Sequence, residues 1–122
     1  MKLHATRPSG VNTITGYGEG YVMVNGERRV SSLVVLPDRI EPWEAKTFDQ
    51  LSAEDFTFLK SLQAEIVLLG TGARQRFPHP RLTAALAQAG IGLEVMDLQA
   101  ACRTYNILVA EERKVAASLL FA

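Results

Sequence analysis

The residues best suited to chemistry lie in one short stretch, where a run of apolar side chains ends in glycines and arginines. Residues 66–76 read Ile-Val-Leu-Leu-Gly-Thr-Gly-Ala-Arg-Gln-Arg, which indicates a buried strand that leads into a turn. In α/β proteins, ligands commonly bind where a strand ends in such a turn before a helix. Backbone N–H groups at helix starts attract anions, and guanidinium groups add charge-assisted hydrogen bonds. The pattern therefore favours binding of a small anion.

A second strand, predicted over residues 93–96, is expected to run parallel to the first, so that both strand ends meet at one edge of the sheet. This edge would gather the turn with the start and the polar face of the next helix. The candidate ligand-binding residues are Gly70, Thr71, Gly72, Arg74, Arg76, Asp97, Arg103 and Asn106.

The same residues also fit a purely structural role, in which the glycines make a tight turn and the arginines are solvated. The stretch is not a dinucleotide fingerprint, because Gln75 stands where the third glycine would be, and no Gly-Lys-Ser/Thr follows to make a P-loop. Asn106, in the middle of a predicted helix, would bond either a neighbouring backbone group or a ligand. The sequence leaves both alternatives open.

Residues that could catalyse a reaction are scarce. Cys102 lies on the apolar face of a predicted helix and is expected to be a core thiol. His4 and His79 have no partners at metal-ligand spacing, so neither a metal nor a cofactor is predicted. No Ser-His-Asp, Cys-His or paired-carboxylate arrangement can be drawn from these residues, which argues against an enzyme.

The elements that position these residues begin with β-rich segments. Asn25-Gly26 is typical of a two-residue hairpin turn, and the glycines at 16, 18 and 20 indicate bulges. A strand is predicted over residues 31–36, followed by an irregular segment at 41–44. Trp43 in that segment is expected to cover the core, and the alternative is an exposed anchor for a partner.

Strands and helices then alternate. The predicted elements are a helix capped by Ser52, a central strand at 65–69, a helix at 80–89, a strand at 93–96, a helix capped by Asp97 and a strand at 114–121. This order predicts an α/β sheet from about residue 31 onward, with the N-terminal hairpin as an added β layer.

The length of 122 residues predicts a single domain over residues 1–122. Thirteen basic and thirteen acidic side chains cancel, which argues against nucleic acid as a partner. One cysteine allows no internal disulfide, and the apolar runs are too short to span a bilayer. We expect a cytoplasmic protein with no direct membrane insertion.

Four segments, namely residues 66–72, 92–96, 101–111 and 115–117, resemble a small α/β family. That family includes mitochondrial respiratory complex I assembly factor 3 and the adipogenesis-associated domain protein. The resemblance implies a three-layer fold, with a central mixed five-stranded sheet, helices on its faces and an additional β element. It implies no established activity or cofactor. Glu111-Glu112 stands where relatives are expected to have Glu-Gly, so a differently shaped helix end is expected.

We therefore predict a non-enzymatic interaction protein that resembles a complex I assembly factor. Its partner would be a protein client from a respiratory or other membrane-associated complex. The alternative is a binder of a small anionic metabolite, or an unrecognised enzyme, that uses the crevice at the Gly70–Arg76 turn.

Overall fold

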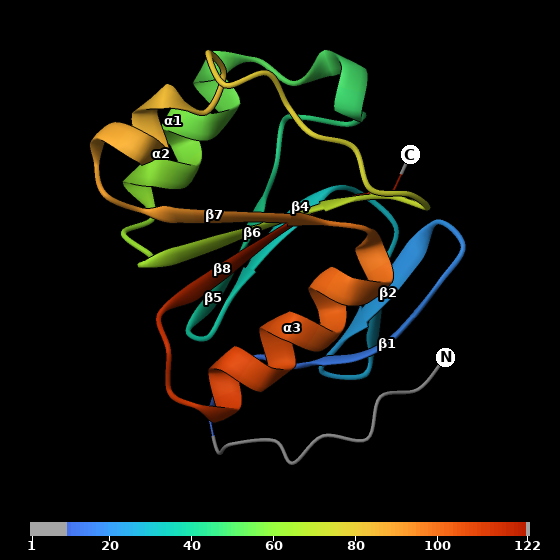
Figure 1. Cartoon of the computed structure of the whole chain (residues 1–122). Coiled ribbons are helices and arrows are strands. Elements are labelled where there is room, and N and C mark those ends of the chain that lie inside the picture. Colours follow the sequence, from blue (N-terminus) through green and yellow to red (C-terminus); the bar gives the residue numbers. More distant parts are fainter. Residues whose placement is uncertain (1–9, 122) are drawn as a thin grey trace.

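The structure is a computed structural model that describes residues 10–121, and its centre is a mixed five-stranded sheet (Figure 1). In spatial order the strands are β5 (Arg39–Pro42), β4 (Leu33–Leu36), β8 (Val115–Leu120), β6 (Ile66–Thr71) and β7 (Gly92–Met96). β4 runs antiparallel to both of its neighbours, whereas β8, β6 and β7 are mutually parallel. The predicted α/β class and the mixed sheet are confirmed.

A second, antiparallel sheet forms from β1 (Ile14–Gly18), β2 (Tyr21–Val24) and β3 (Glu27–Arg29). Asn25 and Gly26 have φ values of 53° and 81°, the two positive angles that a type I′ hairpin turn requires. The register of β1 against β2 shifts between Ile14 and Gly16, which confirms a bulge in this glycine-rich segment. The predicted hairpin is thus present, and β1 extends it to three strands.

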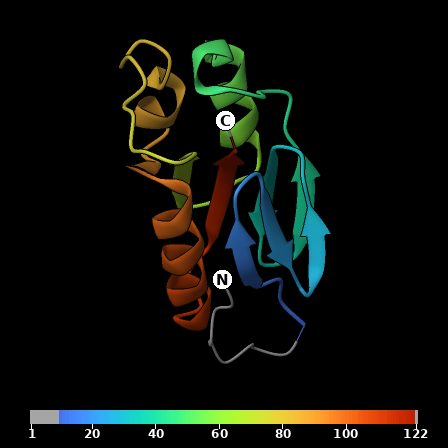
Figure 2. The same ribbon diagram turned by 90° about the vertical axis from the view of Figure 1, so that its right-hand side faces the viewer.

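The two faces of the five-stranded sheet carry separate hydrophobic cores. Leu33 and Val35 of β4 point to one face, where α3 (Leu98–Ala110) and the small sheet pack; Figure 2 shows these two side by side. Val34 and Leu36 point to the opposite face, which is covered by α1 (Ala53–Ser61), α2 (Ala84–Gln88) and the 3₁₀ turn η1 (Phe48–Gln50). This alternation within one strand produces the expected three layers.

Three predicted elements differ from the structure. The central strand is β8 rather than β6, because β8 lies between β4 and β6. The segment 41–44, predicted to be irregular, includes the last two residues of β5, which pairs with β4 and ends at Pro42, as a proline at a sheet edge allows. The helix predicted from Pro80 begins only at Ala84, because the N–H groups of Leu82 and Thr83 bond the carbonyls of two preceding residues in turns.

Two further expectations concern helix ends, namely a cap at Ser52 and a differently shaped end at Glu111-Glu112. Ser52 caps α1, and the Asp55 carboxylate accepts the Ser52 N–H at 2.9 Å. At the end of α3, Glu112 has a φ of 60° although it is not glycine. Its N–H bonds the Val109 carbonyl, and the next N–H bonds the Leu108 carbonyl, both at 2.9 Å. This is a Schellman motif, so the helix keeps the left-handed end that glycine normally makes.

Candidate functional site

The turn after β6 lies where the sequence places it, at the shared edge of two parallel strands. Gly70 of β6 pairs with Met96 of β7, so the carboxyl ends of both strands meet. A Cβ atom on Gly70 would lie 3.0 Å from the Ala101 Cβ atom and 3.1 Å from a Leu119 methyl group. Gly72 has a φ of 83°, which starts the turn. The two glycines therefore allow close packing of α3 and a sharp change of chain direction.

Polar atoms of this turn bond to one another and to the neighbouring β7 and α3. The Thr71 hydroxyl lies 2.7 Å from the Arg74 carbonyl oxygen and accepts the Arg76 N–H at 3.1 Å. The Leu98 N–H bonds the Gly72 carbonyl at 2.8 Å. The Gln75 amide donates to the Val95 carbonyl of β7 at 2.9 Å. These bonds join the carboxyl ends of β6 and β7 and occupy groups that a ligand there would need.

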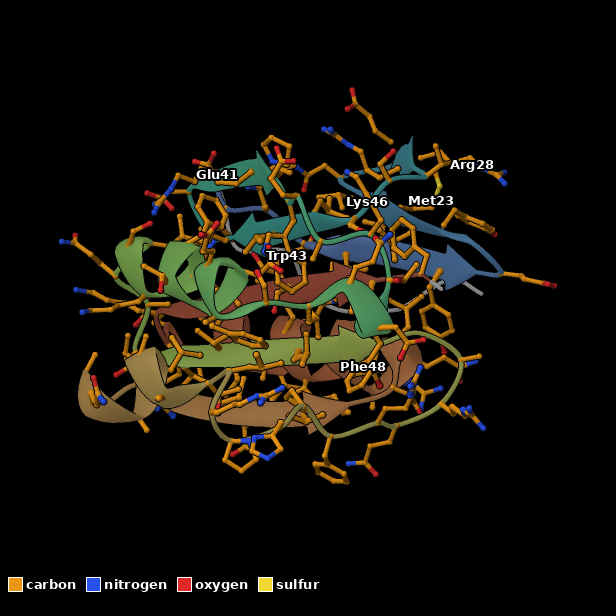
Figure 3. The ribbon with its side chains drawn as sticks, turned by 90° about the horizontal axis from the view of Figure 1, so that it is seen from above. Met23, Arg28, Glu41, Trp43, Lys46 and Phe48 are labelled. Atoms are coloured by element: carbon orange, nitrogen blue, oxygen red, sulfur yellow. The ribbon has the colours of Figure 1, made fainter. Side chains whose placement is uncertain are left out.

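The two candidate arginines of this turn, Arg74 and Arg76, have different surroundings. The Arg76 guanidinium donates to the Asp49 carboxylate at 2.8 Å and lies 4.2 Å from the centre of the Phe48 ring. Phe48 and Asp49 belong to η1, and Figure 3 shows the Phe48 side chain beside that turn. Arg74 is exposed and forms no ion pair with any carboxylate of residues 10–121. Arg76 is therefore engaged with η1, and only Arg74 is left for another charge.

The candidate residues of α3 hold the fold together. The Asp97 side chain caps the helix by accepting the Ala100 N–H at 2.8 Å, as predicted. Arg103 donates to the Tyr17 hydroxyl of β1 at 2.9 Å. Asn106 is buried rather than on the polar face, and it makes two hydrogen bonds to the backbone of Ile14. Of the two roles left open for Asn106, the structure realises the backbone contact.

A hollow of about 470 Å³ lies next to this edge, between the β1–β2 turn and the start of α3. Its volume falls within the range of roughly 300–1,000 Å³ that small-molecule sites occupy. Of the eight candidate residues, Gly72 alone lines it. The remaining lining residues are Tyr17, Gly18, Glu19, Gly20, Ala73, Leu98, Gln99 and Phe121. Binding of an anion at this edge stays a prediction.

The other reactive side chains are buried or serve turns. Cys102 is a core thiol, as predicted, and burial raises its pKa to about 12. Burial and the nearby Asp38 carboxylate also raise the pKa of the Tyr105 hydroxyl, which donates to the Asn12 carbonyl at 2.8 Å. A neutral thiol is a poor nucleophile, so neither group is suited to catalysis near pH 7.

The two histidines are the remaining candidate metal ligands. His79 is exposed, and its Nδ1 atom accepts the Arg81 N–H at 3.1 Å, whereas His4 lies outside the described residues. Among residues 10–121, no three His, Cys, Asp or Glu side chains gather closely enough to hold a metal ion.

The sequence did not point to Phe77 as a prominent surface residue, whereas it placed Trp43 correctly. Phe77, in the segment between β6 and α2, is 71% exposed. The signal was an aromatic residue between arginines and prolines, where no apolar periodicity would bury it. Trp43 is 1% exposed and packs in the core under α1, which confirms that it covers the core; Figure 3 shows it on this side of the sheet.

Comparisons with known proteins agree with this architecture. A family model described as "Protein of unknown function (DUF498/DUF598)" matches residues 14–120. NADH dehydrogenase [ubiquinone] 1 alpha subcomplex assembly factor 3 of Bos taurus is 33% identical over 109 residues, which are 88% of this chain. Those residues span 59% of the bovine protein, which is less than two thirds of its length.

Bacterial proteins are similar over a larger share of their own length. An uncharacterized protein of Rhodobacter capsulatus is 32% identical over 114 residues, covering 92% of this chain and 86% of the relative. A crystal structure of a Bordetella parapertussis protein is 36% identical, with a TM-score of 0.88, and the match covers 95% of this chain and 100% of that one.

Proposed function

The chain belongs to the DUF498/DUF598 family of proteins of unknown function, and on that basis we propose that it is a non-enzymatic interaction protein. Its client would be a subunit or intermediate of a respiratory or other membrane-associated complex. The observation that carries the proposal is the similarity to a complex I assembly factor over 88% of this chain. Because the chain spans only 59% of that relative, the client itself is part of the proposal.

The local chemistry supports binding rather than catalysis. Thr71, Asp97 and Asn106 direct their side-chain oxygen atoms to backbone groups of the chain itself. Cys102 is a buried thiol with a raised pKa. Catalysis normally needs a base, a nucleophile or a metal with supporting groups. The candidate side chains are instead used to join β6, β7, α3 and the small sheet.

The proposed location is the cytoplasm, where the chain would meet the client before or during its assembly at a membrane. None of the helices formed by residues 10–121 has the length and apolar character needed to cross a bilayer. Contact with a membrane complex would accordingly be made through protein surfaces.

Deletion of the gene in the organism that encodes this chain tests the proposal. We expect a reduced amount of fully assembled complex I on native gels of detergent-solubilised membranes, and restoration by the full-length chain. Capture of the tagged chain should recover complex I subunits from the same extracts, with an untagged strain as control. Unchanged complex I in the deletion strain, together with no recovered subunit, would contradict the proposal.

The second candidate function is binding of a small anionic metabolite at the Gly70–Arg76 turn, with or without catalysis. It is favoured by the hollow of about 470 Å³ that Gly72 helps to line. Arg74, which follows the lining residue Ala73 in the chain, would supply the positive charge, because Arg76 is already paired with Asp49.

A further inference from the structure

The segment between β6 and α2 presents an apolar side chain together with unpaired positive charge. We call residues 73–83 the Phe77 loop. Three large hydrophobic side chains of the described residues are well exposed, and Phe77 is the most exposed of them, at 71%. Residues 73–81 contain three arginines and no acidic residue. Asp49 pairs with Arg76, whereas no carboxylate of residues 10–121 pairs with Arg74 or Arg81.

The Phe77 loop is held in place along its length. At its start, the Thr71 hydroxyl contacts the Arg74 carbonyl oxygen, and Gln75 bonds β7. In its middle, Arg76 is held by Asp49 and by the ring of Phe48. Near its end, bonds from Arg81, Leu82 and Thr83 to His79 and Pro80 form consecutive turns. An ordered loop loses little conformational freedom on binding, so its side chains are pre-organised for contact.

Most residues of the loop are exposed. Figure 1 shows it (yellow) running from the end of β6 past η1 and α1 to α2. The stretch from Arg74 to Arg81 covers at most about 24 Å of chain. A single extended peptide segment can therefore reach both arginines and the phenylalanine between them.

We propose that the Phe77 loop docks an acidic segment of a partner protein. Carboxylates of that segment would pair with Arg74 and Arg81, and an apolar patch between them would cover the Phe77 ring. Aromatic and arginine side chains are the types that dominate protein interfaces when they become desolvated. The proposal rests on the proposed function, for which it supplies the contact surface and the chemistry of the client.

The charge and the size of the Phe77 loop favour an acidic protein segment over a membrane or a nucleic acid as its partner. One phenyl ring and two unpaired guanidinium groups fall short of the paired signals that stable membrane anchoring takes. Nucleic-acid binding calls for a basic excess over a whole face, whereas this chain has 13 basic and 13 acidic residues. An acidic protein segment needs only the charges that the loop presents.

A selection with random dodecapeptides, displayed on phage and presented to the immobilised full chain, tests the inference. Enriched peptides should carry a clear acidic excess and at least one large apolar residue. A synthetic copy of the best peptide, followed by fluorescence anisotropy, should lose affinity at least 10-fold with Phe77→Ala. The same loss is expected with the double variant Arg74→Glu/Arg81→Glu.

Matched controls separate the loop from general surface effects. Val30 is 65% exposed on another part of the molecule, so Val30→Ala should bind the peptide as the parent does. Arg28→Glu/Lys60→Glu changes the net charge by the same amount as the loop double variant, and should change affinity less than twofold. The unfolding temperature of each variant should stay within a few degrees of the parent, because all of these side chains are exposed. The Arg28→Glu/Lys60→Glu control loses the contact of the Arg28 guanidinium with the Tyr21 ring, whose centre is 4.0 Å away.

Several results would overturn the inference. These are failure to enrich any peptide, enrichment of neutral or basic peptides, and equal losses in the loop and control variants. Tighter binding of the parent chain to vesicles of anionic phospholipid than to the selected peptides would show that the loop is a lipid-binding surface instead.

The deletion strain distinguishes this inference from the proposed function. If complex I assembles normally without the gene, the proposed function fails, and the peptide results still decide whether the loop binds acidic segments. If assembly depends on the gene but Phe77→Ala restores it fully, the proposed function stands and the loop is not its contact surface.

Discussion

Asn106 of α3 and Ile14 of β1 are 92 residues apart in sequence and are joined by a reciprocal pair of hydrogen bonds. The Ile14 N–H donates to Asn106 Oδ1 at 2.9 Å, and Asn106 Nδ2 donates to the Ile14 carbonyl at 2.7 Å. The asparagine amide thus takes the place of a strand neighbour for β1. Through this contact the small sheet is fixed to the helix that packs on the main sheet.

Replacing Asn106 with leucine should therefore destabilise the whole fold. The change keeps the branching at Cγ but leaves the buried N–H and carbonyl groups of Ile14 without partners. Each unsatisfied group costs about 1–3 kcal/mol, so for the two groups we expect a loss of about 2–6 kcal/mol in urea unfolding. Ile107→Ala, at an exposed position on the same helix, serves as the control. A loss below about 0.5 kcal/mol for Asn106→Leu, typical of surface changes, would refute this role.

Gly70→Ala should lower stability by about 1–3 kcal/mol, because the new methyl group presses β6 against α3. The clash would be with the Ala101 Cβ atom at 3.0 Å. Ala101→Gly alone should also cost stability, through helix propensity, by about 1 kcal/mol. Combined in one chain, the two changes should cost less than their sum, as measured in a double-mutant cycle by urea unfolding. Strict additivity would show that the contact does not limit substitution at Gly70.

Glu112→Gly is expected to stabilise the protein by about 0.5–1 kcal/mol, since glycine adopts the left-handed conformation without steric cost. The corresponding rise in melting temperature is a few degrees for a chain of this size. Glu112→Ala is the control and should give no such gain, because alanine keeps the Cβ atom. Equal melting temperatures for the glycine and alanine variants would mean that the φ of 60° imposes no strain.

Alkaline pH should weaken the fold through Cys102. Burial raises the pKa of its thiol from an ordinary value of 9.0 to about 12, so the folded state retains a proton that the unfolded state releases. The stability that this pKa difference contributes is fully present below about pH 9. It is lost as the pH rises toward 12, at about 1.4 kcal/mol per pH unit.

Comparing stability at pH 8 and pH 10.5 isolates this effect. The parent should lose about 2 kcal/mol more than Cys102→Ala over that interval, because only the parent has the thiol. The raised pKa of Tyr105 acts in the same direction in both proteins and cancels in the comparison. Equal losses would indicate that the thiol titrates normally in the folded protein.

Anion binding at the Gly70–Arg76 turn can be tested by thermal shift with a panel of anionic metabolites. A ligand at 100 times its dissociation constant stabilises by about 2.7 kcal/mol, which corresponds to a shift of several degrees. Arg74→Ala should remove the shift. Arg76→Ala should remove less of it, because its guanidinium is paired with Asp49. An undiminished shift in the Arg74→Ala/Arg76→Ala double variant would place the ligand elsewhere.

The local features of the fold could be predicted from sequence because their causes are local. Asn25-Gly26 dictates its own turn, and Ser52 and Asp97 cap the helices that follow them. Strand order could not be predicted in this way. β6 and β8 are both short apolar runs, and which of them becomes central depends on packing between distant segments.

The candidate site could likewise be predicted only in its local features. That the turn after β6 lies beside β7 followed from the parallel arrangement of the two strands. The ion pair between Arg76 and Asp49 could not be predicted, because Asp49 lies 27 residues away on a turn without a strong sequence signal. The partner of Asn106 is still more distant in the chain, so its amide could not be assigned to the backbone or to a ligand from spacing alone.

β8 is the last of the described strands in the sequence, yet it is the one that unites β4 with β6. A ribosome therefore delivers both flanking halves of the sheet before the piece that joins them. Until β8 emerges, β4 and β6 each have an exposed strand edge with unpaired backbone N–H and C=O groups. Such edges can pair with other chains. The sheet can only be completed once β8 has been synthesised, so the exposed edges of β4 and β6 persist until that point.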